Sequence, residues 1–248
     1  MKLFGLIGYP LSHSFSKKYF TQKFTEEAIT DCLFELFPLS SIDLFPGLVA
    51  AKSDLKGLAV TIPWKQAVIP YLTELDDEAK RIGAVNCICV YGSTLKGYNT
   101  DVIGFERSFL PLVQPHHTKA LVLGTGGAAK AVQFVLEKTG MEYLTVSRNP
   151  AALKGMIAYN QLDKALLQEY TVVINCTPVG MTPDENAAPD IPYGHIGSKH
   201  LLYDLVYKPP VTLFLQHGLD QGAVVKNGYE MLIIQAEENW RLWNEQHT

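Results

Sequence analysis

A glycine-rich turn between an apolar run and a helix-like segment constrains the fold of this chain more than any other feature. The turn lies in LVLGTGGAAKAVQFVL, residues 121–136, and its residues 124–129 match the pattern G-x-G-x-x-A. The glycines permit a tight turn and let a pyrophosphate approach backbone N–H groups at a helix N-terminus, while Ala129 lets the helix pack closely on the strand. A turn without a ligand is the alternative, but the strand–turn–helix context favours a dinucleotide-binding unit. The Gly-Lys-Ser/Thr of a P-loop does not follow, which excludes that motif.

The end of the next strand-like run, LTVSRN, bears on which dinucleotide binds. Folds that prefer NAD usually place Asp or Glu at this point to bind the ribose hydroxyls. This chain has Ser147 and Arg148 instead, and a guanidinium can pair with a 2′-phosphate that a carboxylate would repel. The sequence therefore predicts NADP rather than NAD, with a solvated surface arginine as the alternative.

Apolar runs and helix-compatible segments alternate along the chain in two blocks. In the first hundred residues the strand-like runs are KLFGLIG, CLFELFPL and LKGLAVTI, and their alternation with helix-compatible segments indicates a parallel sheet. NCICVY and LKGYN flank a glycine-containing turn and predict a hairpin. The second block begins near residue 119, and the last twenty residues have apolar positions at helical spacing.

These patterns predict an α/β fold with two domains. One is an N-terminal, mainly parallel α/β domain formed by residues 1–101 and 229–248. The other is a Rossmann-type NADP-binding domain over residues 102–228. Two such units predict a cleft between them, which is where small-molecule sites usually lie.

Composition and charge narrow the range of partners. The chain of 248 residues has 21 basic and 25 acidic residues and no polybasic block, which argues against nucleic acid or an anionic membrane as a partner. No apolar stretch approaches the length of a membrane span, and the N-terminal MKLFGLIGYP is too short for a signal peptide. The cysteines lack CxxC or zinc spacing, so we expect no metal site and free thiols in a cytoplasmic protein. They are Cys32, Cys87, Cys89 and Cys176.

Polar residues gather where the strand-like runs of the first block end. GYPLSHSFS follows the first run and contains Ser12, Ser14 and Ser16. One serine is expected to cap a helix, while further hydroxyls suit a polyhydroxylated ligand. The third run ends at VTIPWKQ with Thr61 and Lys65.

Two more polar residues follow in the hairpin region, Asn86 in GAVNCI and Asp101 in GYNTD. Ligands bind at strand ends of this kind in open α/β sheets. Taken alone, Lys65 would be a surface lysine and Asp101 the N-cap of the following helix. Because these polar residues occur together at strand ends, we interpret them as parts of one ligand site.

Eight motifs occur in an order and at a spacing that resemble the shikimate dehydrogenase family, which includes the quinate/shikimate dehydrogenases. The motifs are GYPLSHSFS, VTIPWK, GAVN, GYNTD, GTGGAAKA, INCTPVGM, YDLVYKP and NGYEMLIIQA, and the resemblance as a whole runs from residue 3 to about residue 243. The resemblance implies an NADP-dependent enzyme of aromatic amino acid (chorismate) biosynthesis that interconverts 3-dehydroshikimate and shikimate. The N-terminal domain and the last helix would bind the substrate, and the Rossmann-type domain would bind NADP.

The resemblance also implies roles for individual residues, with Lys65 and Asp101 as the catalytic pair. The implied substrate-binding residues are Ser14, Ser16, Thr61, Lys65, Asn86, Asp101, Tyr207 and Gln235. The implied cofactor-binding residues are Gly124, Thr125, Gly126, Gly127, Ala128, Ala129, Ser147, Arg148, Thr177, Val206 and Gly228. Within these sets the two serines would bind the substrate carboxylate, and the last three residues would lie near the nicotinamide. The Asn-Arg-Thr that is common in the family is Ser-Arg-Asn at residues 147–149, which retains the arginine.

A lysine ammonium near a ketone can stabilise developing negative charge and donate a proton, but the sequence leaves open which of Lys65 and Asp101 accepts the proton in each direction. One alternative is a bifunctional quinate/shikimate dehydrogenase that uses NAD or NADP. Another is a non-catalytic NADP or quinate sensor on the same fold, against which the intact Lys65 and Asp101 argue. A folate-linked methylene dehydrogenase is a third, against which Ser14 and Ser16 argue. We expect a small-molecule substrate and a monomer or homodimer.

Overall fold

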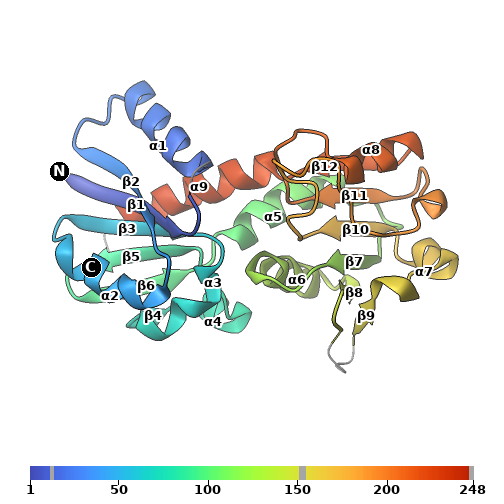
Figure 1. Ribbon diagram of the computed structural model, residues 1–248, viewed down its shortest axis with the longest axis horizontal. Coiled ribbons are helices and arrows are strands. Elements are labelled where there is room, and N and C mark those ends of the chain that lie inside the picture. The colour runs from blue at the N-terminus through green and yellow to red at the C-terminus, as the bar shows by residue number, and fades with distance from the viewer. Residues whose placement is uncertain (12–13, 151–154, 246–248) are drawn as a thin grey trace. The chain divides into compact units, whose positions relative to one another are not determined.

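The computed structural model describes residues 1–11, 14–150 and 155–245. It divides into two compact units, one of residues 1–100 with 236–248 and one of residues 101–235. Over the described residues, each unit is built on a six-stranded sheet with helices packed on it (Figure 1). The predicted first domain includes Asp101 and residues 229–235, whereas this division places them with the second unit.

The sheet of the first unit is mixed, with the strand order β2-β1-β3-β5-β6-β4. β1 is parallel to both β2 and β3, as the alternation of apolar runs predicted. β5 and β6 form the predicted hairpin, and β5 also pairs antiparallel with β3. The bounds are β1 Lys2–Gly8, β2 Cys32–Pro38, β3 Leu55–Val60, β4 Glu74–Leu75, β5 Cys87–Tyr91 and β6 Thr94–Tyr98.

The helices of the first unit begin at residues that suit helix N-termini. Ser14 caps α1 by accepting a hydrogen bond from the Lys17 N–H at 3.4 Å, and Asp76 caps α4 by accepting one from the Glu78 N–H at 3.0 Å. Pro46 lies in the first turn of α2, where proline is tolerated. The bounds are α1 Phe15–Glu26, α2 Phe45–Ala51, α3 Trp64–Ala67 and α4 Asp77–Ile82, with 3₁₀ turns η1 Ile42–Leu44 and η2 Ile69–Tyr71.

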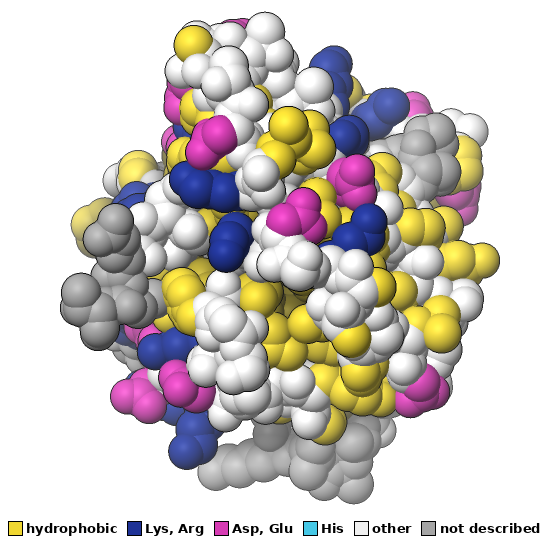
Figure 2. All heavy atoms as spheres, turned by 90° about the vertical axis from the view of Figure 1, so that its left-hand side faces the viewer, with side chains coloured by type: hydrophobic (Ala, Val, Ile, Leu, Met, Phe, Trp, Pro, Cys, Tyr) yellow, Lys and Arg dark blue, Asp and Glu magenta, His cyan; other side chains and the backbone are white. Residues whose placement is uncertain are grey.

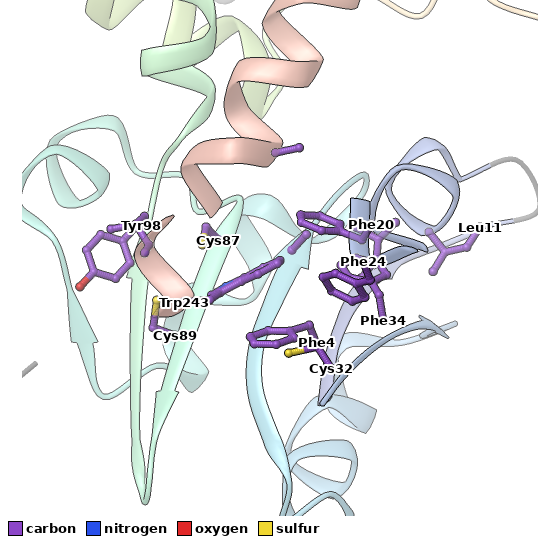
Figure 3. Packing of buried hydrophobic residues seen from close by; sticks show 14 residues of the cluster. Phe4, Leu11, Phe20, Phe24, Cys32, Phe34, Cys87, Cys89, Tyr98 and Trp243 are labelled. Atoms are coloured by element: carbon purple, nitrogen blue, oxygen red, sulfur yellow. The ribbon is translucent and has the colours of Figure 1, made fainter. Parts of the chain in front are cut away.

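An aromatic core holds the end of the last helix, α9 (Tyr229–Asn244), on the first sheet (Figure 3). The Phe4 and Trp243 rings stack at 5.1 Å, and the Phe20 and Phe34 rings stack at 4.7 Å. A Cβ on Gly57 would lie only 2.3 Å from the Trp243 ring, so this glycine makes room for the indole. The apolar positions predicted from the last twenty residues therefore serve a buried face of this helix.

The sheet of the second unit is entirely parallel, with the order β12-β11-β10-β7-β8-β9. This is the strand order of the doubly wound dinucleotide-binding fold, with β7 as its first strand. The bounds are β7 Lys119–Leu123, β8 Glu142–Ser147, β9 Met156–Ala158, β10 Val172–Asn175, β11 Leu201–Asp204 and β12 Val224–Asn227. The predicted Rossmann-type α/β fold is confirmed.

The second unit contains four helices and the first part of a fifth among its described residues. They are α5 Asp101–Phe109, α6 Gly127–Thr139, α7 Lys164–Glu169, α8 Leu213–Asp220 and the first part of α9, with 3₁₀ turns η3 Leu110–Leu112, η4 Tyr159–Gln161 and η5 Tyr193–His195. α5 precedes β7, α9 follows β12, and the other helices lie between strands. Between Pro150 and Tyr170 the sequence pattern predicts no clear elements, whereas the structure has β9, η4 and α7 there.

Acidic and basic side chains are interspersed on the face shown in Figure 2. All four cysteines are free, and no helix among the described residues is long and apolar enough to cross a membrane. Within residues 1–11, 14–150 and 155–245, no group of three His, Cys, Asp or Glu side chains could hold a metal ion.

Candidate functional site

The turn between β7 and α6 is built around two glycines with different requirements. Gly124 has φ +107°, and a Cβ there would lie 3.0 Å from the Thr177 side chain, so only glycine fits without strain. Gly126 precedes the first turn of α6, and a Cβ there would meet nothing within 4 Å. Among the described residues, no side chain caps this helix. Its first N–H groups therefore remain available for a phosphate beside Gly126, which fits the pyrophosphate of a dinucleotide.

Arg148 lies just beyond the end of β8. β8 pairs with β7, the strand that leads into the glycine-rich turn. Ser147 pairs with Ala158 of β9. The next residue after each, Arg148 and Tyr159, therefore lies at the carboxyl edge of the sheet. The charge of Arg148 is felt there, because it opposes the rise in the pKa of Tyr159 that burial causes. The guanidinium is exposed and, in the described part of the chain, has no ion-pair partner. A cation at this position fits a 2′-phosphate.

Three further predicted cofactor residues follow the neighbouring strands β10, β11 and β12. Thr177 donates its hydroxyl proton to Asn175 Oδ1 at 2.6 Å. The Gly228 N–H donates to the Val206 carbonyl at 3.2 Å, and a Cβ on Gly228 would lie 2.2 Å from the Leu205 carbonyl oxygen. Because the carboxyl ends of parallel strands share one edge, these residues belong to the same edge as the phosphate turn.

Two buried polar residues that end β10 and β11, Asn175 and Asp204, were not among the predicted site residues. Both are fully buried. Burial raises the pKa of the Asp204 carboxyl to about 6, and its hydrogen bonds with Thr212, Val206 and Asn175 oppose that rise. A polar residue that ends an otherwise apolar run, as in VVIN and LLYD, is the sequence signal that could have found them.

In the first unit, the backbone places Thr61, Lys65 and Asn86 near one another. The Val60 N–H donates to the Asn86 carbonyl at 2.8 Å, and the Val85 N–H donates to the Lys65 carbonyl at 2.7 Å. Thr61 follows the donor Val60, and Asn86 follows the donor Val85. Two backbone hydrogen bonds therefore link the segments that carry all three predicted site residues. This supports their interpretation as parts of one site.

Lys65 lies on the short helix α3, which a neighbouring tryptophan anchors. The Trp64 indole N–H donates to the Leu39 carbonyl at 2.9 Å, and the Trp64 backbone N–H donates to the Thr61 carbonyl at 2.9 Å. The Lys65 side chain is half-buried. Its setting therefore differs from that of a fully solvated surface lysine, and Trp64 fixes the direction of the helix that carries it.

Asn86 belongs to a buried polar network with Thr100 and Asn239. Asn86 Oδ1 accepts a hydrogen bond from the Thr100 N–H at 2.6 Å, and Asn86 Nδ2 lies 3.0 Å from Thr100 Oγ1. The Thr100 hydroxyl donates to Asn239 Oδ1 at 2.6 Å. Asn86 is therefore held by the protein itself, in addition to any contact with a ligand.

The serines expected to bind a carboxylate lie at the start of α1. Ser14 is the N-cap, as expected for one serine of the cluster, and Ser16 lies in the first helical turn. Both are half-buried. Ser12 and His13 lie outside the described residues.

In the second unit, Asp101 and Gln235 lie on helices that pack together. Asp101 is the first residue of α5 and is 5% exposed. One turn later, a Cβ on Gly104 would lie 2.6 Å from the Met231 carbonyl oxygen and 3.2 Å from the Gln235 Cβ. Gly104 thus lets α9 approach the same face of α5 that carries Asp101. Tyr207 is half-buried, and burial raises its pKa.

Comparison with known proteins gives one consistent result. A family model described as the shikimate dehydrogenase substrate binding domain matches residues 6–88. The NADP(+) shikimate dehydrogenase of Halothermothrix orenii is 36% identical to this chain, over 96% of this chain and 89% of that protein. That of Synechocystis sp. is 35% identical, over 100% of this chain and 91% of that protein.

Solved structures of similar proteins agree with the sequence comparisons. The shikimate dehydrogenase of Aquifex aeolicus has a TM-score of 0.87 at 28% identity, covering 100% of this chain and 94% of that chain. The shikimate 5-dehydrogenase of Thermus thermophilus, solved in complex with NADP(H) and shikimate, has a TM-score of 0.86 at 31% identity. That match covers 98% of this chain and 94% of the Thermus chain.

Proposed function

This chain belongs to the shikimate dehydrogenase family, and we propose that it is an NADP-dependent shikimate dehydrogenase, which reversibly reduces 3-dehydroshikimate to shikimate. The observation that carries this function is the match to NADP(+) shikimate dehydrogenases along nearly the whole of both chains. Two features of this chain support NADP as the cofactor. The uncapped N-terminus of α6 suits the pyrophosphate, and Arg148 after β8 suits the 2′-phosphate.

NADP would be held at three places along the carboxyl edge of the second sheet. The pyrophosphate fits the N–H groups of residues 124–129, and the 2′-phosphate fits Ser147 and Arg148. Thr177, Val206 and Gly228 are assigned to the nicotinamide half. When bound, the reduced nicotinamide supplies the hydride, and the protein supplies orientation and proton handling.

We assign proton handling to Lys65 and Asp101. The Lys65 ammonium stabilises the negative charge that develops on the ketone oxygen during reduction, and it donates the proton that completes the hydroxyl. Asp101 is proposed as the second member of the catalytic pair, as the family resemblance implies. In the reverse direction the same pair accepts the hydroxyl proton.

The remaining substrate contacts divide by chemistry. Hydroxyl donors from Ser14 and Ser16 suit the carboxylate of shikimate, and side chains with both donors and acceptors suit its hydroxyls. The residues proposed for the hydroxyls are Thr61, Asn86, Asp101 and Gln235, and Tyr207 is proposed to reach the substrate.

The decisive experiment measures formation of the reduced nucleotide, NADPH or NADH, by the purified protein with shikimate or quinate as substrate and NADP+ or NAD+ as acceptor. We expect turnover with shikimate and NADP+ to exceed every other combination. Preference for quinate would indicate the quinate-oxidising alternative, and binding of NADP+ without turnover on either substrate would indicate a sensor.

We also propose a cytoplasmic enzyme that acts on a small molecule as a monomer or homodimer, without a nucleic-acid or membrane partner. The free cysteines support a reducing compartment. Light scattering coupled to size-exclusion chromatography measures the assembly, and a larger oligomer would contradict it.

A further inference from the structure

The ends of β10 and β11 are joined by a buried bridge of three polar side chains, Asn175, Asp204 and Thr212. Asp204 Oδ1 accepts hydrogen bonds from Asn175 Nδ2 at 2.9 Å and from the Val206 N–H at 3.0 Å. Asp204 Oδ2 accepts one from the Thr212 hydroxyl at 2.6 Å. Asn175 Oδ1 accepts hydrogen bonds from the Thr177 N–H at 3.0 Å and its hydroxyl at 2.6 Å. The bridge therefore fixes Thr177 and Val206 at the same time.

The register of the strands explains why one hydrogen bond can lock both loops. Asn175 and Asp204 are partners in the parallel pair of β10 and β11, and each is the last residue of its strand. Thr177 lies two residues after Asn175, and Val206 lies two residues after Asp204. The Val206 carbonyl then accepts a hydrogen bond from the Gly228 N–H, which ties in the end of β12. All three residues assigned to the nicotinamide half are thus linked to the bridge.

Burying the charged carboxylate of Asp204 carries a desolvation penalty that reduces the stability of the fold. Asn175, Asp204 and Thr212 are each fully buried, and the hydrogen-bond donors to Asp204 are all neutral groups. The pKa of Asp204 is raised in spite of these donors. The free-energy penalty of burying the charge therefore exceeds the stabilisation that these hydrogen bonds give to the ionised form. Local features that cost stability tend to occur at functional sites, where they improve positioning.

We propose that Asn175 and Asp204 are positioning residues, which hold Thr177 and Val206 in place for the nicotinamide half of NADP. The inference rests on the proposed function, because that function assigns Thr177 and Val206 to the nicotinamide. Hydrogen bonds to a carboxylate are roughly twice as strong as those to a neutral acceptor. The ionised Asp204 therefore holds the Val206 N–H and the Asn175 amide more firmly than an uncharged side chain would.

The test replaces Asp204 by asparagine, which has the same size and keeps an acceptor toward Asn175 and Val206. Four quantities are measured: the unfolding temperature, the turnover number, the Kd of NADP+ and the Kd of adenosine 2′,5′-bisphosphate, which lacks the nicotinamide half. We expect Asp204→Asn to unfold no earlier than the wild type and to lose turnover by about 10- to 100-fold, the cost of a small misplacement of reacting groups. The Kd of NADP+ should rise, while the Kd of the bisphosphate should stay unchanged.

A matched control removes another buried hydrogen bond of the same unit. Ser108 and Tyr203 share one at 2.6 Å, and Tyr203 precedes Asp204 on β11. Ser108→Ala should lower the unfolding temperature while leaving both Kd values and turnover close to those of the wild type. Asn175→Ala provides a second variant of the bridge, with the same expected selectivity for NADP+ over the bisphosphate.

The results separate this inference from the proposed function. Wild-type turnover and NADP+ affinity in a folded Asp204→Asn would overturn the positioning role. An equal rise in both Kd values would also overturn it, because the damage would then not be confined to the nicotinamide half. If the wild type binds both nucleotides but oxidises no shikimate, the proposed function fails, and the ratio of the two Kd values in the variants still decides the positioning role.

Discussion

The buried carboxylate of Asp204 should make the stability of the protein depend on pH in a direction opposite to that of an ordinary ion-paired aspartate. Its pKa of about 6 lies about two pKa units above the unfolded value of 3.8. Each unit corresponds to about 1.4 kcal/mol, so the ionised side chain destabilises the folded state by about 3 kcal/mol at neutral pH. The three neutral hydrogen-bond donors already act in this balance, so the figure is what remains after their contribution.

The sign follows from which state takes up a proton first. Between about pH 7 and about pH 5 the folded protein protonates Asp204, whereas the unfolded chain stays ionised. The free energy of unfolding should therefore rise by about 1.3 kcal/mol from this group as the pH falls through that interval. Cys176 and Tyr193 feel the charge of Asp204, but burial raises both of their pKa values, so neither titrates in this range.

Urea unfolding of the wild type and Asp204→Asn, each at both pH values, isolates this contribution. Every other titrating group is common to the two proteins, so it cancels in their difference. We expect the stability advantage of Asp204→Asn to shrink by about 1.3 kcal/mol on going from about pH 7 to about pH 5. A difference between the two proteins that does not change with pH would refute the reasoning.

Three further expectations concern the two units separately. Lys65→Ala should lose turnover by about 10²- to 10⁴-fold, with a much smaller change in the KM for shikimate; Lys56→Ala, an exposed lysine on β3, is the control, and near-normal turnover of Lys65→Ala would contradict its role in proton transfer. Arg148→Ala should raise the KM for NADP+ by about 10- to 100-fold through loss of charge-assisted hydrogen bonds. The exposed Arg107→Ala is its control, and an equal effect on NAD+ would argue against a 2′-phosphate contact. Trp243→Ala should lower the free energy of unfolding by about 3 to 5 kcal/mol in urea titrations, because a ring packed on Phe4 and on Gly57 is lost. A loss below about 1 kcal/mol would mean that the last turn of α9 is not anchored by this ring.

Local sequence patterns predicted the parts of the fold that depend on local conformation. The glycines at 124 and 126 were assigned to a tight turn before a helix, and the structure has Gly124 at φ +107° and Gly126 as the N-cap of α6. Ser14 was among the serines expected to cap a helix. In each case the physical reason lies within a few residues of the chain, which is why it can be read from sequence.

Other features depend on partners that are distant in the sequence and were not predicted. The Asn175–Asp204 hydrogen bond joins residues 29 positions apart, and it requires the register that places both at the ends of paired strands. The elements between Pro150 and Tyr170 were also missed, because β9 has only three residues and carries no clear period. The hydrogen bond between Asn86 and Thr100 was not predicted either, because it depends on the β5–β6 hairpin that brings the two residues together.

The two units meet the same physical problem in the same way. A strand that ends at a ligand site must pass from apolar core to polar surface, and the last buried polar groups need hydrogen-bond partners that water cannot supply. In the first unit Asn86, Thr100 and Asn239 satisfy one another behind the segment that carries Lys65. In the second unit the bridge of Asn175, Asp204 and Thr212 does so behind Thr177 and Val206. The segments that carry the proposed site residues are thus held by buried hydrogen-bond networks, so substitutions of Asn239 or Asp204, which are assigned no ligand contact, should alter the proposed site through their neighbours.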